Sequence, residues 1–222
     1  MTSIELIAEL RSHANPANVA GMAQFGINPH DTLGVSIPVV RELAKRAGRD
    51  HALAAALWES GIHEARVLAA LVDDPRWVTE EQMERWVTAF DSWDVCDQVC
   101  SNLFDRTPYA VDKAMEWAGR REEFVKRAGF ALMAALAWHD RRSPDETFLQ
   151  FLPVILREST DQRNFVKKAV NWALRQIGKR NPALMQAAIQ TAREMQAIQS
   201  PAARWIAADA LREFARHGEV EA

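Results

Sequence analysis

Cysteine, glycine and proline are all scarce in this chain of 222 residues, which has 2 Cys, 9 Gly and 9 Pro. So few turn-forming residues, beside abundant alanine, favour helices over a fold of many short strands. The two cysteines, Cys96 and Cys100, stand four residues apart on one expected helix, which suits neither a disulfide nor a complete metal site. We interpret both as core thiols, in keeping with a reducing cytoplasm.

Long apolar runs are also missing, so no membrane-spanning helix is predicted. The first ten residues carry two glutamates and do not resemble a signal peptide. The chain lacks a Gly-rich phosphate loop, an HExxH or GxSxG motif and a Cys/His metal set. We therefore expect a cytoplasmic protein whose chemistry does not depend on any of these motifs.

Neither sign of charge dominates, because 27 Lys and Arg stand against 30 Asp and Glu, a net charge of −3. The distribution is uneven: residues 1–110 hold 9 basic and 16 acidic side chains (−7), and residues 111–222 hold 18 and 14 (+4). Between Lys113 and Arg180 the count is 14 against 8, or +6. Such a local basic field can hold a phosphate backbone, although solvated faces of helical repeats carry the same residues.

Helix starts are marked by capping residues, several of them followed by proline. The predicted starts are Thr79-Glu80-Glu81-Gln82, Thr107-Pro108, Ser143-Pro144-Asp145-Glu146, Asn181-Pro182 and Ser200-Pro201. Between these starts the apolar residues follow helical spacing, and no segment alternates convincingly as a strand would.

Weak internal repeats accompany these helices. Residues 124–128 (FVKRA) resemble residues 165–169 (FVKKA), with looser copies at residues 63–66 and 201–204. A spacing near 40 residues is typical of HEAT or armadillo helix pairs. The sequence therefore predicts an all-α solenoid of stacked HEAT-like antiparallel helix pairs, one domain over residues 1–222, with a concave basic face as its binding surface.

Eight tryptophans are many for this length, and Trp172 does not fall where a core would put it. On a helix expected over residues 161–179, it lies about 115° from the centre of the apolar stripe. Its neighbours on that face are Lys168, Arg175 and Lys179. An indole among three cations suits a surface that meets a polyanion and a flat group.

Trp93 and Asp97 form a second such group, on a helix expected from Ser92 to about Phe104. They are an i,i+4 pair, about 40° apart, on the flank of the apolar stripe. A carboxylate beside apolar surface can stabilise a cation or orient a water molecule. Asp94 points away from the stripe and is expected to be solvated, and Arg127 lies on the flank of a later helix.

Packing offers an alternative explanation for each of these residues. A tryptophan on a helix flank often seals the groove between two helices, and we expect this of several here: Trp58, Trp77, Trp86, Trp117 and Trp205. For Trp138 both interpretations remain open. Asp97 could simply pair with an arginine of a neighbouring repeat.

Three segments together resemble the HEAT-like DNA alkylation repair glycosylases of the AlkD type. They are Ser92-Trp93-Asp94-Val95-Cys96-Asp97, Lys126-Arg127-Ala128, and Lys168-Ala169-Val170-Asn171-Trp172-Ala173-Leu174-Arg175. Residues 34–41 (GVSIPVVR), ending at Arg41, are similar, less closely, to the N-terminal phosphate-contacting turn of that family. The order and approximate spacing agree along most of the chain.

The resemblance implies a hydrolase of base excision repair that removes positively charged alkylpurines, such as 7-methylguanine and 3-methyladenine, from double-stranded DNA. It implies Asp97 as the catalytic carboxylate, with Trp93 and Trp172 lining a cleft against the deoxyribose. Arg127 and Arg175 would hold phosphates, and we add Lys168 and Arg41 to the expected DNA contacts. No metal and no organic cofactor are implied. A capped solenoid is expected to be a monomer.

Chemistry agrees with these roles, because an alkylated purine is already cationic and leaves without an added proton. Positive charge then develops on the sugar, where indole faces and one carboxylate stabilise it. Two alternatives stay open. One is a non-catalytic family member that binds branched or damaged DNA, and the other is a HEAT-type scaffold for protein partners.

Overall fold

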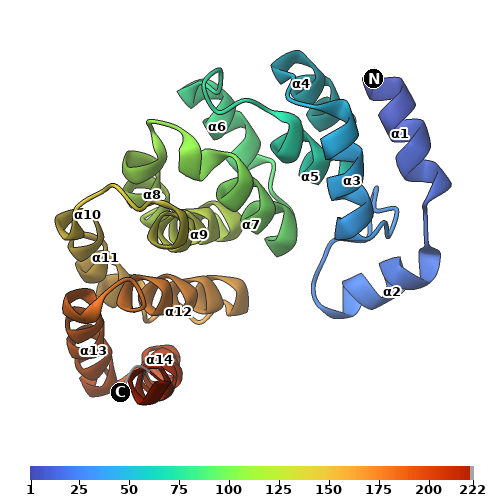
Figure 1. The fold of residues 1–222 in the computed structure, drawn as a ribbon. Helices are drawn as coiled ribbons and strands as arrows, with labels where there is room; N and C mark the ends of the chain where they lie inside the picture. Colours follow the sequence, from blue (N-terminus) through green and yellow to red (C-terminus); the bar gives the residue numbers. More distant parts are fainter. Residues whose placement is uncertain (221–222) are drawn as a thin grey trace. The chain divides into compact units, whose positions relative to one another are not determined.

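The computed structural model describes the backbone of residues 1–220 and the side chains of residues 1–216. These residues form helices and connecting turns without a strand, which confirms the all-α class (Figure 1). The helices gather into two compact units, Met1–Thr107 and Pro108–Ala222. A single repeat domain over residues 1–222 stays a prediction. None of the described helices is both long and apolar enough to cross a membrane.

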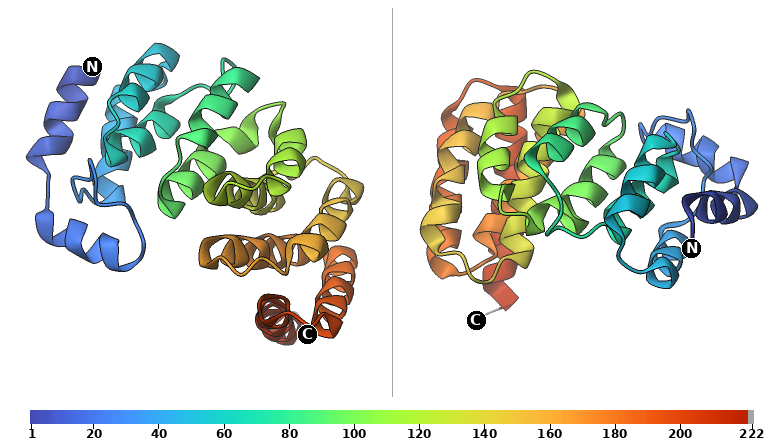
Figure 2. Two further views of the ribbon diagram at one scale, coloured as in Figure 1. Left: turned by 180° about the vertical axis from the view of Figure 1, so that it is seen from behind. Right: turned by 90° about the horizontal axis from the view of Figure 1, so that it is seen from above.

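The first unit contains seven α-helices and a short 3-10 turn among its described residues. They are α1 (Ser3–Ser12), α2 (Pro16–Gln24), α3 (Ile37–Ala47), α4 (His51–Glu59), α5 (His63–Val72), α6 (Glu80–Thr88), α7 (Trp93–Asn102) and η1 (Phe104–Arg106). Helix α5 packs against α3, α4 and α7, and so lies at the centre of this unit (Figure 2).

The second unit is built from longer helices. They are α8 (Ala110–Ala118), α9 (Glu123–His139), α10 (Asp145–Leu149), α11 (Phe151–Glu158), α12 (Asn164–Gly178), α13 (Pro182–Ala197) and α14 (Pro201–Val220). Helix α9 packs between α8 and α12, and α12 in turn contacts α13 and α14. Consecutive helices joined by short turns therefore pack as pairs, as the sequence predicts.

The internal repeats coincide with the second helix of each pair. The two similar segments, residues 124–128 and 165–169, lie in the first turns of α9 and α12, and the looser copies open α5 and α14. Phe124 and Phe165, which occupy equivalent positions, lie with their ring centroids 5.7 Å apart. The repeated sequence thus stacks equivalent helices on one another.

Close packing of α8 on α9 depends on Gly129. A Cβ atom at this position would lie 2.4 Å from the backbone nitrogen of Ala118 and 2.9 Å from the carbonyl oxygen of Ala114. Both neighbours are backbone atoms, which cannot rotate away as a side chain could. Glycine at position 129 therefore allows the two backbones to approach one another.

Three of the predicted helix starts are confirmed and two are displaced. Helices α6, α13 and α14 begin directly after Thr79, Asn181 and Ser200. Helix α8 begins at Ala110 rather than after Thr107, because the Thr107 hydroxyl donates to the Phe104 carbonyl. Helix α10 begins at Asp145, and the Ser143 hydroxyl donates back to Asp140 instead of capping the helix.

The core contains three of the tryptophans expected to be buried. Trp58, Trp86 and Trp117 are 4 % exposed or less, and Trp58 stacks on Trp86 with ring centroids 4.0 Å apart. Trp77, 66 % exposed in the turn before α6, does not seal a groove as expected, whereas Trp205, 40 % exposed on α14, packs against Lys167 of α12, whose Nζ lies 4.8 Å from the centre of its ring. Cys96 and Cys100 are buried and not in a disulfide, as expected of core thiols, and burial raises the pKa of the Cys100 thiol well above its usual value.

Candidate functional site

Helix α7 places Trp93 at its first position, where neighbouring segments fix the chain. Ser92, just before the helix, is buried and accepts a hydrogen bond from the Asn28 backbone N–H at 2.9 Å. The Trp93 indole N–H donates to the Phe25 carbonyl at 3.1 Å, and the side chain is half-buried. These contacts hold the indole ring in one orientation while leaving part of it open to solvent.

Asp97 lies one turn after Trp93 on the same helix and is also half-buried. Residues four apart on a continuous helix lie on one side of it, so the indole and the carboxylate share an edge of α7. The Asp97 backbone carbonyl accepts a hydrogen bond from the Ser101 hydroxyl at 2.6 Å, which supports the helix below the carboxylate. This pair is the first half of the predicted site.

Asp94, on the same turn, is not solvated as the sequence suggested. Its Oδ2 lies 2.8 Å from Nε2 of His63, the buried first residue of α5, and its side chain is 16 % exposed. Burial lowers the pKa of His63, but the hydrogen bond and negative charge of Asp94 outweigh burial, so the pKa is raised. The pair ties the start of α7 to α5, directly beside Trp93.

An apolar groove of about 530 Å³ borders Trp93 in the first unit. It is lined by residues of α2 and of the segment that follows: Ala17, Asn18, Gly21, Met22, Phe25, Ile27, Gly34, Val35 and Trp93. Phe25 is 72 % exposed at its edge, whereas Trp58 is buried in the core. Phe25 therefore lines the groove together with Trp93, whereas Trp58 is not part of its lining.

The loop before α3, predicted as a phosphate-contacting turn, directs its backbone amides inward. The buried Glu64 carboxylate accepts hydrogen bonds from the N–H groups of Leu33, Gly34 and Val35 at 2.9, 2.6 and 3.1 Å. Three successive amides around one anion form a nest of the kind that otherwise binds phosphate. Glu64 thus occupies the position of the anion.

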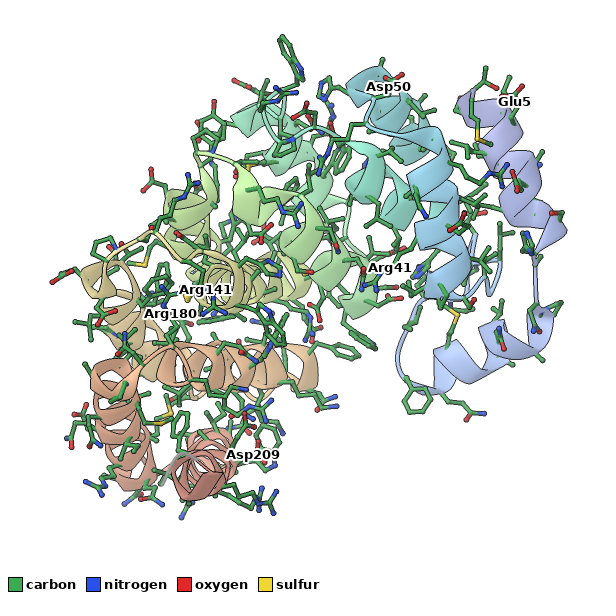
Figure 3. All side chains as sticks on the ribbon, viewed as in Figure 1. Glu5, Arg41, Asp50, Arg141, Arg180 and Asp209 are labelled. Atoms are coloured by element: carbon green, nitrogen blue, oxygen red, sulfur yellow. The ribbon has the colours of Figure 1, made fainter. Side chains whose placement is uncertain are left out.

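Arg41 lies on α3, where its side chain is exposed (Figure 3). Among the described side chains it makes no hydrogen bond or ion pair. Arg41 is therefore accessible to a DNA phosphate, as the prediction requires. The backbone amides of the preceding loop are not, because they bind Glu64. Its role in DNA binding stays a prediction.

In the second unit, Arg127 is buried in the contact between α9 and α12. Its Nη1 donates to the Phe165 carbonyl at 2.6 Å, at the first turn of α12, and the residue is 6 % exposed. A guanidinium carries five N–H donors, and this bond satisfies one of them. Arg127 therefore joins the two repeated helices, and its contact with phosphate stays a prediction.

Helix α12 carries the other predicted residues, which lie on one face but differ in their partners. Trp172 is half-buried, and its indole N–H lies 3.3 Å from the Gln176 amide oxygen when that amide is oriented to accept. Lys168, one turn earlier, is exposed and makes no hydrogen bond or ion pair among the described side chains. Trp172 and Lys168 thus remain accessible on α12.

Arg175, in contrast to Lys168, is paired with carboxylates of α14. Its Nη1 lies 2.5 Å from Glu213 and 3.5 Å from Asp209, and Glu213 also accepts from Lys179 at 2.6 Å. Asp209 is labelled in Figure 3, on α14. These carboxylates compete with a phosphate for Arg175, so the predicted phosphate contact of this residue requires that it exchange partners.

The count of basic residues between Lys113 and Arg180 overstates the free positive charge. Several of these residues have carboxylate partners within the unit, among them Lys113, Lys126, Arg157, Arg163, Arg175 and Lys179. Arg121, Arg141, Arg142 and Lys168 have no side-chain hydrogen bond or ion pair among the described residues. The basic field of this unit therefore depends on a few side chains.

Sequence reasoning missed Glu64 and His63, which support the site without belonging to it. Both open α5, in the segment that resembles the repeats, and the loop amides that Glu64 binds lie about thirty residues earlier, so no local pattern indicates the nest. Among the described residues, no group of three His, Cys, Asp or Glu side chains could hold a metal ion.

The predicted residues are divided between the two units. Trp93, Asp97 and Arg41 belong to the first, and Arg127, Lys168, Trp172 and Arg175 to the second. That they act together in one site stays a prediction.

Known proteins resemble this chain in both sequence and fold. The family model described as DNA alkylation repair enzyme matches residues 6–214. An uncharacterized protein of Listeria monocytogenes is 24 % identical over 170 residues, covering 74 % of this chain and 75 % of its own.

A solved structure superposes with a TM-score of 0.78 at 20 % identity, covering 87 % of this chain and 83 % of the other. It is described as representing a new family of proteins related to the HEAT-like repeat DNA glycosylases, with affinity for branched DNA structures. The match establishes the HEAT-like repeat fold that the sequence predicts.

Proposed function

We propose, from the premise that this chain belongs to the DNA alkylation repair enzyme family, that it excises positively charged alkylated purines from double-stranded DNA. The reaction is hydrolysis of the N-glycosidic bond between the damaged base and its deoxyribose. The observation that carries the proposal is the pair Trp93 and Asp97, one turn apart and half-buried at the start of α7.

The reaction does not need a strong general acid. A purine such as 7-methylguanine carries a positive charge, so its departure neutralises the base and needs no proton. The bond's electron pair leaves with the base, and positive charge develops on the sugar. A fixed carboxylate and the electron-rich face of an indole both stabilise that charge more in the transition state than in the ground state.

In this proposal Asp97 supplies the negative charge and orients the water that attacks the sugar. Trp93, held by its bond to the Phe25 carbonyl, and Trp172 of α12 place ring faces beside the deoxyribose. Arg127, Lys168 and Arg41 contact phosphates, and Arg175 joins them if the DNA displaces Asp209 and Glu213. We also propose that the protein works as a monomer.

The test is release of free base from duplex DNA treated with a methylating agent, with wild type compared to Asp97→Asn. We expect wild type to release methylpurine and the variant to lose about 10²- to 10³-fold in rate, the typical effect of removing one charge-stabilising group. Asp112→Asn, an exposed carboxylate on α8, is the matched control and should release base as wild type does. A folded Asp97→Asn protein that released base at the wild-type rate would overturn the role of Asp97.

The alternative is a DNA-binding protein without glycosylase activity. It is favoured by the structural match to a family with affinity for branched DNA and by the involvement of Arg175 in ion pairs. Salt-sensitive DNA binding by wild type with no release of base would select this alternative. Asp97 would then be a structural residue.

A further inference from the structure

A small hollow lies in the second unit, where the C-terminal ends of α9 and α12 meet. It has a volume of about 230 Å³ and is lined by Ala137, Trp138, Arg141, Gln176, Lys179 and Arg180. This volume is below the roughly 300 Å³ of sites that enclose a whole small ligand. The hollow can take a phosphate group while the rest of a nucleotide stays outside.

Trp138 borders this hollow and is 58 % exposed. Its ring meets His139 edge-on at 6.5 Å and does not seal a groove between helices. Large apolar side chains with this much exposure are candidates for contact with a partner. The indole offers a flat surface of the size that a nucleobase stacks on.

Positive charge surrounds the same hollow. Arg141 is exposed, and none of the described side chains forms a hydrogen bond or ion pair with it. Lys179 shares the carboxylate of Glu213 with Arg175. Figure 3 labels Arg141 and Arg180 close to one another at this end of the unit.

Arg180 gives the hollow a fixed cation. Its Nη1 donates to the carbonyls of Ala137 and Asp140 at 2.9 and 2.6 Å, and its guanidinium lies 3.7 Å from the centre of the Phe148 ring. The Asp140 carboxylate is engaged by Ser143 and by the Arg142 backbone N–H. The charge of Arg180 is therefore held by neutral carbonyl groups and an aromatic ring, without a direct carboxylate partner.

We propose that this hollow binds one unpaired nucleotide of a DNA strand, with its phosphate beside Arg141 and Arg180 and its base stacked on Trp138. The base must be unpaired, because the rings of a duplex stack on one another and offer no free face to Trp138. Gln176 links the hollow to Trp172, since its amide lies 3.3 Å from the indole N–H and from Lys179 Nζ. The inference rests on the proposed function in requiring that the protein bind DNA.

The experiment compares the binding of two fluorescently labelled DNAs, a blunt duplex and the same duplex with a single-stranded tail, by fluorescence anisotropy. For Trp138→Ala we expect binding of the tailed DNA to weaken by about 5- to 100-fold, the usual effect of losing one base–aromatic stack, with little change for the blunt duplex. For Arg141→Ala we expect weaker binding of the tailed DNA and a slope of log affinity against log salt that is shallower by about one.

Matched controls are Trp77→Ala, another exposed tryptophan, and Arg193→Ala, an exposed arginine on α13. Both should bind the tailed DNA as wild type does. If Trp138→Ala and Arg141→Ala also bind it as wild type does, the hollow is not a nucleotide site, and the proposed glycosylase function is unaffected. If wild type binds neither DNA, the proposed function fails and this inference fails with it.

Discussion

His63 and Asp94 join α5 to α7 through one buried contact of 2.8 Å, directly beside Trp93. The contact fixes the position of the α7 N-terminus relative to α5. The charged form of His63 is stabilised in the folded protein, because the hydrogen bond and charge of Asp94 outweigh the effect of burial and raise its pKa. The stability of the fold is therefore linked to the protonation of this residue.

The stabilisation from His63 is fully present below the unfolded-state pKa, about 6.5, and is lost as pH rises through the raised pKa of the folded state. We expect the difference in unfolding free energy between wild type and Asp94→Asn to be largest at acidic pH and to shrink as pH rises past neutrality. Urea unfolding of both proteins across this range measures it. A difference that does not vary with pH would contradict the assignment.

The contact of His63 with Asp94 also shows what is missed when side chains are placed by their angle around a single helix axis, as on a helical wheel. The wheel correctly placed Trp93 and Asp97 on the flank of one helix, but it assigned Asp94 to solvent because it considers one helix at a time. The partner of Asp94 comes from another helix, about thirty residues earlier in the sequence. Glu64 was missed for the same reason, since its three partners are backbone amides of a distant loop.

At the scale of helices, the close contact of α8 with α9 depends on the absence of a Cβ atom at Gly129. We expect Gly129→Ala to lower the unfolding free energy by about 1–3 kcal/mol, the usual cost of overpacking, because its Cβ would meet the backbone of Ala118 at 2.4 Å. Chemical denaturation of the full chain gives the value.

Gly119→Ala is the matched control, ten residues away at the end of α8. Its Cβ would lie 3.5 Å from the Glu116 carbonyl, an ordinary contact, and its backbone has right-handed helical angles. Here alanine should be neutral or stabilise by up to about 1 kcal/mol, because it restricts the unfolded chain. Equal effects at the two positions would show that the approach of α8 to α9 is not the cause.

Helix boundaries were predictable where capping is local. Asn181 caps α13 by accepting a hydrogen bond from the backbone N–H of Leu184, the third residue of the helix, as its sequence indicates. Thr107 and Ser143 carry the same signal, but their hydroxyls bond to residues before them, so α8 and α10 begin later. A cap-like residue thus has more than one partner available, and its choice depends on the preceding chain.

At the scale of the whole molecule, the charged residues could be counted from the sequence, but which of them form ion pairs could not be predicted from it. Of the 14 cations between Lys113 and Arg180, several are engaged in ion pairs within the second unit, such as that of Lys126 with Glu158 at 2.6 Å. Pairs such as Lys126–Glu158 and Lys179–Glu213 join residues more than thirty positions apart, which no local pattern reveals, whereas others, such as Arg163–Asp161, are local. Six cations of this stretch form no ion pair among the described side chains: Arg121, Arg141, Arg142, Lys167, Lys168 and Arg180.

The salt dependence of DNA binding by this stretch should reflect these six side chains. Each neutralised phosphate contributes about 0.9 to the slope of log affinity against log salt, so we expect a slope of about −5. Fourteen engaged cations would give about −13 by the same rule. A titration of duplex DNA at several salt concentrations measures the slope, and a value near the steeper limit would mean that DNA displaces the internal carboxylates.

The stacked indoles of Trp58 and Trp86 have an optical consequence. Their planes are 3° from parallel with centroids 4.0 Å apart, so the electronic transitions of the two chromophores couple, and we expect a split circular dichroism band from the skewed transition dipoles of the pair. Both belong to residues 1–107, so the split band reports on that unit alone. The protein therefore carries an intrinsic, label-free probe by which melting of its first unit can be followed separately from the loss of total helicity.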